Sequence, residues 1–211
     1  MEFIISMFQK GGPLMYPLLL LGAIVIGLII ERAYSLRESK VIPKKTVEEI
    51  IFFIKEGRIQ DAFAVARHQD SLATEIIAAV LNAFVTGRRA KDELTTIAEE
   101  AAKIQLPKLE GYINAIGAIA AIAPLLGFLG TVTGMIQVFE ALSVEGLGNP
   151  EVLSAGISQA LLTTAFGLSI AIPSLAAYWY FKSRVEYLAL ELENIVINIV
   201  YDLADYKEKE E

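Results

Sequence analysis

The segment GISQALLTTAFGLSIAIPSLAAYWYF, residues 156–181, contains no charged residue and is long enough to cross a lipid bilayer. It also contains a glutamine, two adjacent threonines and three serines, which a simple membrane anchor does not need. Small residues on one face of a membrane helix allow close approach of another helix. The segment therefore predicts a membrane helix that packs against protein. Its small and hydroxylated residues at near-heptad spacing are Gly156, Ala160, Thr163, Thr164, Gly167, Ala171 and Ser174.

Two further uncharged runs precede this segment, at residues 11–30 and 111–139. Since a spanning helix needs about 20 apolar residues, the chain predicts an all-α membrane protein with three transmembrane helices. The first run could instead be a cleavable signal peptide. Its length, and the Glu31-Arg32 pair that follows it without a small-residue cleavage site, favour a retained anchor.

The positions of the cations predict the orientation of these helices. Thirteen of the 18 Lys and Arg residues lie between Arg32 and Lys108, and none lies between Lys108 and Lys182. By the positive-inside rule, we expect residues 32–108 and the C-terminus in the cytoplasm. The short N-terminus and the turn at residues 140–151 are then expected on the opposite side of the membrane.

This topology divides the chain into four predicted parts. They are an outward N-terminus with the first membrane helix (1–31), a cytoplasmic helical domain (32–108), a hairpin of the second and third membrane helices (109–181), and a C-terminal cytoplasmic helix with an acidic tail (182–211).

Capping residues predict where the cytoplasmic helices begin and end. Gly57 and Gly87 are placed to end helices, and Ser71 is placed to cap the start of one. Apolar residues recur at helical spacing from Lys91 onward, so we expect that helix to continue through Pro107 into the second membrane span.

A second helical pattern continues beyond Phe181, where apolar residues alternate spacings of three and four. One interpretation is a coiled-coil-like extension of the third membrane helix that packs against neighbours. The other is an amphipathic helix that folds back on the cytoplasmic domain. The apolar positions are Val185, Leu188, Leu192, Ile195 and Ile199.

Neutral polar side chains at membrane depth form the candidate site. Taken alone, each threonine can bond a carbonyl of its own helix and do nothing else. Gln159 has four hydrogen-bonding positions to satisfy, so it needs a polar partner or water. Together such groups suit a narrow hydrated path, or a cradle for a polar residue on another helix. The candidates are Thr131, Gln159, Thr163 and Thr164, with Thr133 and Gln137 nearby.

Neither long span contains Asp, Glu, Lys, Arg or His. A proton path needs a titratable group, which would therefore have to come from a partner. Glycines are expected to allow close helix packing, and prolines to kink the helices or shape a cavity. These residues are Gly127, Gly130 and Gly134 with Pro124 in the second span, and Gly156 and Gly167 with Pro173 in the third.

Composition excludes several classes of function. The chain has no cysteine and a net charge of -7, which gives no basis for thiolate chemistry or nucleic-acid binding. It contains no recognisable nucleophile–base pair, metal cluster or phosphate loop, so we expect neither an enzyme nor a cofactor.

Two motifs carry a family resemblance. APLLGFLGTVTGMIQVF, residues 123–139, followed by the segment quoted first, resembles the MotA/TolQ/ExbB proton channel family. The three helices, the outward N-terminus and the large cytoplasmic loop are similar to the ExbB/TolQ branch. The MotA branch has an additional membrane helix.

The resemblance implies a homopentamer in the bacterial inner membrane, with a central pore lined by the second and third helices. It implies an ExbD- or TolR-like single-span partner whose membrane aspartate carries the proton, and allows a TonB- or TolA-like protein as a further partner. Proton flow would then drive mechanical work across the envelope. Thr131 and Thr164 match the pore-facing threonines of the family.

The chain departs from the family at one position, because many ExbB and TolQ members have glutamate where it has Gln159. An amide does not titrate, so a relay step that depends on this glutamate cannot operate here. The alternative function is a scaffold that assembles around a partner helix without conducting ions.

Overall fold

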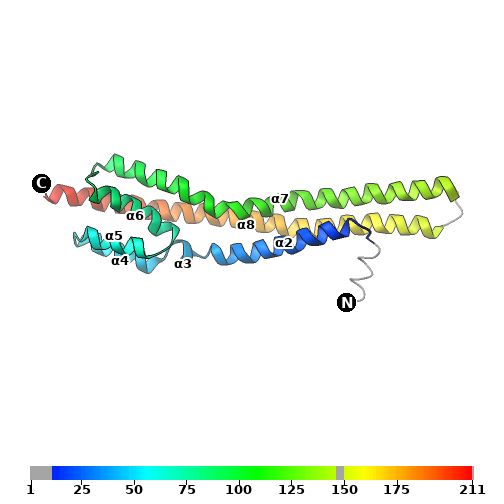
Figure 1. The fold of residues 1–211 in the computed structure, drawn as a ribbon, viewed down its shortest axis with the longest axis horizontal. Helices are drawn as coiled ribbons and strands as arrows, with labels where there is room; N and C mark the ends of the chain where they lie inside the picture. The colour runs from blue at the N-terminus through cyan, green and yellow to red at the C-terminus, as the bar shows by residue number, and fades with distance from the viewer. Residues whose placement is uncertain (1–10, 146–149, 211) are drawn as a thin grey trace. The chain divides into compact units, whose positions relative to one another are not determined.

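Every regular element in the computed structural model is a helix, within the residues that it describes, 11–145 and 150–210. The all-α prediction is therefore confirmed. Part of the predicted periplasmic turn, residues 146–149, lies outside the described residues, as do residues 1–10. The helices in Figure 1 are α2 (Met15–Ser35), α3 (Glu38–Val41), α4 (Lys44–Lys55), α5 (Ile59–His68), α6 (Leu72–Val85), α7 (Lys91–Glu145) and α8 (Pro150–Glu210).

Within the described part of the chain, three helices are long and apolar enough to cross a membrane, as predicted: α2, α7 between Lys91 and Ser143, and α8 between Leu153 and Asp205. With 55 and 61 residues, α7 and α8 far exceed the roughly 20 residues that a bilayer requires. As expected, α7 continues through Pro107 without a break.

The chain forms two compact units. The first comprises residues up to Glu31 together with Tyr112–Tyr180, and it contains the uncharged runs. The second comprises Arg32–Gly111 and Phe181–Glu211, and it contains most of the charged residues.

The helices of the second unit begin and end at the predicted residues. The Ser71 hydroxyl accepts from the Thr74 amide at 3.2 Å, and the Ser71 amide donates to the Thr74 hydroxyl at 3.2 Å. This reciprocal capping box satisfies two amides at the start of α6. Gly57 and Gly87 adopt φ angles of 77° and 98°, which side chains on L-residues disfavour, and so end α4 and α6.

The part of α8 beyond Phe181 is buried along one stripe within the second unit. Leu188, Leu192 and Ile199 are only 1%, 3% and 0% exposed. Ion pairs surround this stripe, because Arg184 lies 3.4 Å from Glu38, and Lys44 contacts both Glu38 and Glu191. Since α8 is unbroken here, it does not fold back, and its stripe packs against the chain's own second unit.

Candidate functional site

The centre of the first unit is a main-chain contact between α7 and α8. A Cβ atom added to Gly167 would lie 2.6 Å from the Ala123 carbonyl oxygen and 3.1 Å from the Gly127 Cα atom. A Cβ atom on Gly127 would lie 3.1 Å from the Thr164 Cα atom. These separations are too short for side chains, so the two backbones touch directly.

The other glycines of the two motifs continue this contact. A Cβ atom on Gly134 would lie 3.0 Å from the Ala160 Cβ atom and 3.1 Å from the Gly156 carbonyl oxygen. Gly130 faces the Thr163 side chain, and Gly156 faces the Val138 side chain, each with no room for a Cβ atom. The five glycines singled out from the sequence therefore all lie in the α7–α8 interface.

Thr164 forms a hydrogen bond between the two helices. Its hydroxyl donates to the Gly127 carbonyl oxygen at 2.8 Å, and its side chain is half-buried. This acceptor belongs to α7, so the bond differs from the usual bond of a threonine to its own helix. The hydroxyl keeps two lone pairs that can accept further hydrogen bonds.

Thr163 lies inside the protomer, where it meets the segment that precedes α2. Its side chain is 1% exposed, and its hydroxyl is 2.9 Å from the Gly11 carbonyl oxygen and 2.8 Å from the Gln159 carbonyl oxygen. A hydroxyl has one hydrogen, which these two acceptors share. The Gln159 side chain is half-buried against Gly12, where an added Cβ atom would overlap its amide nitrogen.

Thr131 is bonded within its own helix. Its hydroxyl donates to the Phe128 carbonyl oxygen at 2.6 Å, and the side chain is half-buried one turn from Gly127. The structure thus gathers Thr163 and Thr164 at the α7–α8 contact, whereas Thr131 is bonded to Phe128 and, among the described residues, makes no bond to α8. Of the two prolines, Pro124 is half-buried in α7 and Pro173 is exposed in α8.

Sequence reasoning missed the role of the Gly11-Gly12 pair, which it treated only as the start of an apolar run. The adjacent glycines followed by Pro13 were the available signal, because such a stretch indicates a turn in which the main chain can approach other groups. It also missed Gly117. A Cβ atom added to Gly117 would lie 2.8 Å from the Tyr178 ring, so this position has no room for a side chain.

The chemistry of this site is limited to hydrogen bonding. Its side chains are hydroxyls and an amide, and the uncharged spans supply no carboxyl group, amine, guanidinium or imidazole. Within the residues that the structure describes, no cluster of His, Asp or Glu could hold a metal ion. The site can orient water or a polar group from another chain, but it cannot itself accept and release a proton.

Three apolar helices of membrane-crossing length, two of them packed through glycine, define an integral membrane protein of the helical class. Residues 68–194, which make up more than half of the chain, match the MotA/TolQ/ExbB proton channel family. The chain belongs to this family, which is one of proton channels and not of enzymes.

Relatives place the chain in the ExbB/TolQ branch, as predicted. The putative biopolymer transport protein ExbB-like 1 of Synechocystis is 32% identical over 206 residues, covering 92% of this chain and 80% of the relative. The biopolymer transport protein exbB1 of Vibrio cholerae is 28% identical, covering 83% and 78%. The Tol-Pal system protein TolQ of Haemophilus influenzae is 32% identical over 92 residues, covering 44% and 40%.

Proposed function

We propose that this chain is the proton-conducting subunit of an ExbB/TolQ-like motor in the bacterial cytoplasmic membrane. Five copies surround the membrane helix of an ExbD- or TolR-like single-span partner, whose aspartate carries the proton. The family match across both motifs is the observation that carries this proposal. The absence of Asp, Glu, Lys, Arg and His from residues 111–139 and 152–181 supports a partner as the source of that group.

Thr131 and Thr164 are the residues that we assign to the proton path, because both side chains are only half-buried in the protomer. Thr163 is enclosed within the chain, so we propose that Thr163 and Gln159 support the path from behind without lining it. Gln159 also supplies no titrating group, so the partner's carboxyl group is sufficient for proton transfer in this proposal.

The Thr164 bond indicates how the hydroxyl would respond to the partner. While its hydrogen is donated to the Gly127 carbonyl oxygen, its lone pairs can accept from a protonated carboxylic acid. A deprotonated carboxylate only accepts, so the hydroxyl would have to turn away from Gly127 and donate to it. The two protonation states of the partner therefore require two orientations of one hydroxyl.

Proton flux into vesicles tests this proposal, with the chain reconstituted alongside a single-span partner that carries a membrane aspartate. Thr131→Val and Thr164→Val should each lower the flux about fivefold, since each removes one hydrogen-bonding group worth about 1 kcal/mol. Thr164→Ser keeps the hydroxyl and should retain most of the flux. Thr96→Val is the control, because that exposed hydroxyl donates to the Asp92 carbonyl oxygen of its own helix, outside the uncharged spans.

A non-conducting scaffold is the second candidate, because Thr131, Thr163 and Thr164 all have hydrogen-bond acceptors within this chain. In a scaffold these bonds would serve packing alone. A scaffold predicts that the assembled complex gives no more flux than the partner alone, and that result would favour it over the channel. Unchanged flux in the Thr131→Val/Thr164→Val double variant, with unchanged assembly, would instead show that these two hydroxyls are not part of the path. The native mass of the extracted complex provides the assembly measurement, and a pentamer with two partner chains is expected.

The charge distribution supports the proposed orientation, with the N-terminus in the periplasm and the C-terminus in the cytoplasm. Cysteine labelling from outside tests it directly, because the chain has no cysteine of its own. A Ser143→Cys variant should react with an impermeant maleimide in intact cells, whereas a Ser39→Cys variant should not.

A further inference from the structure

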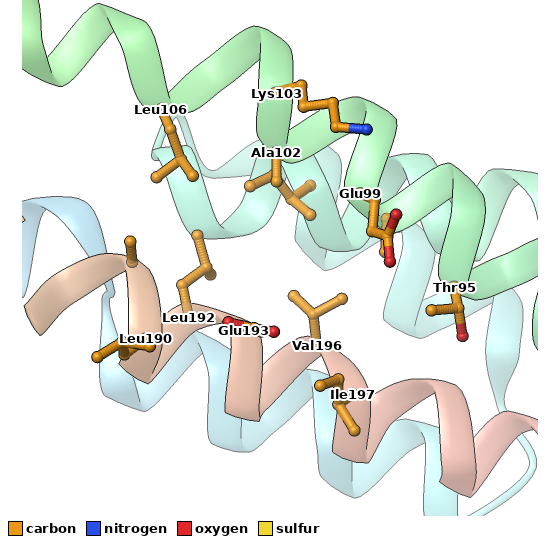
Figure 2. Close-up of a pocket in the computed structure, with 13 residues that line it drawn as sticks. Thr95, Glu99, Ala102, Lys103, Leu106, Leu190, Leu192, Glu193, Val196 and Ile197 are labelled. Atoms are coloured by element: carbon orange, nitrogen blue, oxygen red, sulfur yellow. The ribbon is translucent and has the colours of Figure 1, made fainter. Parts of the chain in front are cut away.

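The second unit contains an open groove that the proposed proton path does not use. Residues 95–106 of α7 and 189–197 of α8 form its two walls around a cavity of about 350 Å³, and Ile76 of α6 also lines it. Most of the lining is aliphatic, so the groove suits an apolar occupant. Figure 2 shows side chains of both walls directed into the space between the helices: Ala102, Leu106, Leu192 and Val196.

Large apolar side chains of α8 are exposed beside this groove at the spacing of a helix-packing seam. Tyr187, Leu190, Ile197 and Tyr201 are 53%, 61%, 39% and 48% exposed, and Asn194 completes the alternation of three and four residues. Leu190 and Ile197 also line the groove. An amphipathic helix needs only one apolar stripe to pack on its own domain, and α8 already buries a different one. Cations already lie over its two tyrosine rings, Lys91 at 3.7 Å from the Tyr201 centroid and Arg184 at 5.3 Å from the Tyr187 centroid. The aliphatic positions between them, Leu190 and Ile197, are the ones that can receive another helix.

Lipid is not the occupant, because this part of α8 is too charged to lie in hydrocarbon. Seven charged residues fall between Lys182 and Asp205. Each charged side chain at the centre of a bilayer costs about 3 kcal/mol on insertion scales. The stripe therefore lies in water unless another protein segment covers it.

The charge around the groove is mainly negative. Glu99 and Glu193 line it with a single cation, Lys103. Two other charged side chains of α8, Arg184 and Glu191, already pair with Glu38 and Lys44. Between Lys182 and Asp205, the exposed carboxylates of α8 are those of Glu186, Glu193 and Asp205. An occupant with apolar residues on one side and cations on the other would complement this surface.

We propose that this groove binds the cytoplasmic flank of the single-span partner, as a basic amphipathic helix of about three turns. The 12 residues of the α7 wall correspond to about 18 Å of helix, which sets the length of the occupant. The positive-inside rule enriches the cytoplasmic flank of any single-span protein in Lys and Arg, the charge that the groove rim requires. This inference rests on the proposed function, from which it takes the existence of that partner.

Two synthetic 12-residue peptides test the inference on the full chain in phosphatidylcholine nanodiscs, with empty nanodiscs as background. Both peptides carry Leu at spacings of three and four residues. At all remaining positions one peptide has Lys and the other has Glu. Fluorescence anisotropy should show saturable binding of the Lys peptide at one site per chain. The Glu peptide should bind at least about tenfold more weakly, because the rim would repel it.

Charge reversals on the protein locate the site. Glu99→Lys/Glu193→Lys should weaken binding of the Lys peptide about tenfold. Glu48→Lys/Glu49→Lys makes the same charge change on the exposed side of α4 and should leave binding within about twofold. Equal losses in the two double variants would overturn the inference in favour of general attraction to an acidic chain. Equal binding of the two peptides would overturn it as well.

A second copy of the chain is the competing occupant. If no Lys peptide binds and Ile197→Asp lowers the native mass, a neighbouring copy fills the groove and the inference is wrong. Peptide binding and proton flux are scored separately. Flux without peptide binding removes only the groove inference, and peptide binding without flux removes only the channel function.

Discussion

Replacing Gly167 by alanine tests whether the main-chain contact of α7 with α8 holds the first unit together. The new Cβ atom would lie 2.6 Å from the Ala123 carbonyl oxygen and 3.1 Å from the Gly127 Cα atom. Both are backbone atoms, so the clash is relieved only when the helices separate. Overpacking of this kind costs about 1–3 kcal/mol. Alanine also gains about 1 kcal/mol of helix propensity, so the net loss should reach up to about 2 kcal/mol.

Gly27→Ala in α2 is the matched control. Among the described residues, no atom lies within 4 Å of a Cβ atom at Gly27, so this variant gains helix propensity without a clash. The difference in unfolding free energy between the two variants isolates the steric cost, which we expect at about 1–3 kcal/mol. Unfolding in mixed micelles of dodecyl maltoside and SDS, followed by the fluorescence of Trp179, measures both. The reasoning fails if Gly167→Ala is as stable as Gly27→Ala.

Three further predictions concern single contacts. Thr163→Val removes the hydroxyl that donates to the Gly11 carbonyl oxygen and should lower the free energy of unfolding by about 1–3 kcal/mol. Amide hydrogen exchange at the start of α2 should become faster, and exchange like that of the unsubstituted chain would contradict this. Ser71→Ala removes the capping box of α6 and should cost about 1 kcal/mol in thermal unfolding, whereas Ser71→Thr should cost clearly less. The hydrogen bond and charge of Lys44 lower the pKa of Glu38 below its ordinary 4.5. The stabilisation by this carboxylate is therefore complete above pH 4.5 and is lost as the pH falls through the lowered pKa. Lys44→Met should remove that part of the acid sensitivity in urea titrations at successive pH values, and an unaltered pH profile would argue against the pair.

Local sequence signals were sufficient for the elements of this fold. Uncharged runs give the spanning helices because hydrocarbon excludes charge, and Gly57, Ser71 and Gly87 act through their immediate backbone neighbours. The near-heptad spacing of small residues also identified one packing face on each long helix, since periodicity fixes which residues share a face.

The same periodicity could not tell which partner each polar residue meets. Thr163 and Thr164 are adjacent, so their side chains point about 100° apart around α8. One therefore reaches the Gly11 carbonyl, 152 residues away in the sequence, and the other reaches Gly127. Spacing within one helix contains no information about the path of a distant segment, and thus the enclosure of Thr163 appears only in three dimensions.

The contact of Gly127 with Gly167 also determines how the hairpin can move. An interface made of side chains can slip, because rotamers change to accommodate small displacements. Here the atoms in contact belong to the two backbones, and a shift along either helix would drive Ala160 or Thr163 into the main chain opposite. We therefore expect the spanning parts of α7 and α8 to move together as one rigid pair, so that a displacement of either helix carries the other with it.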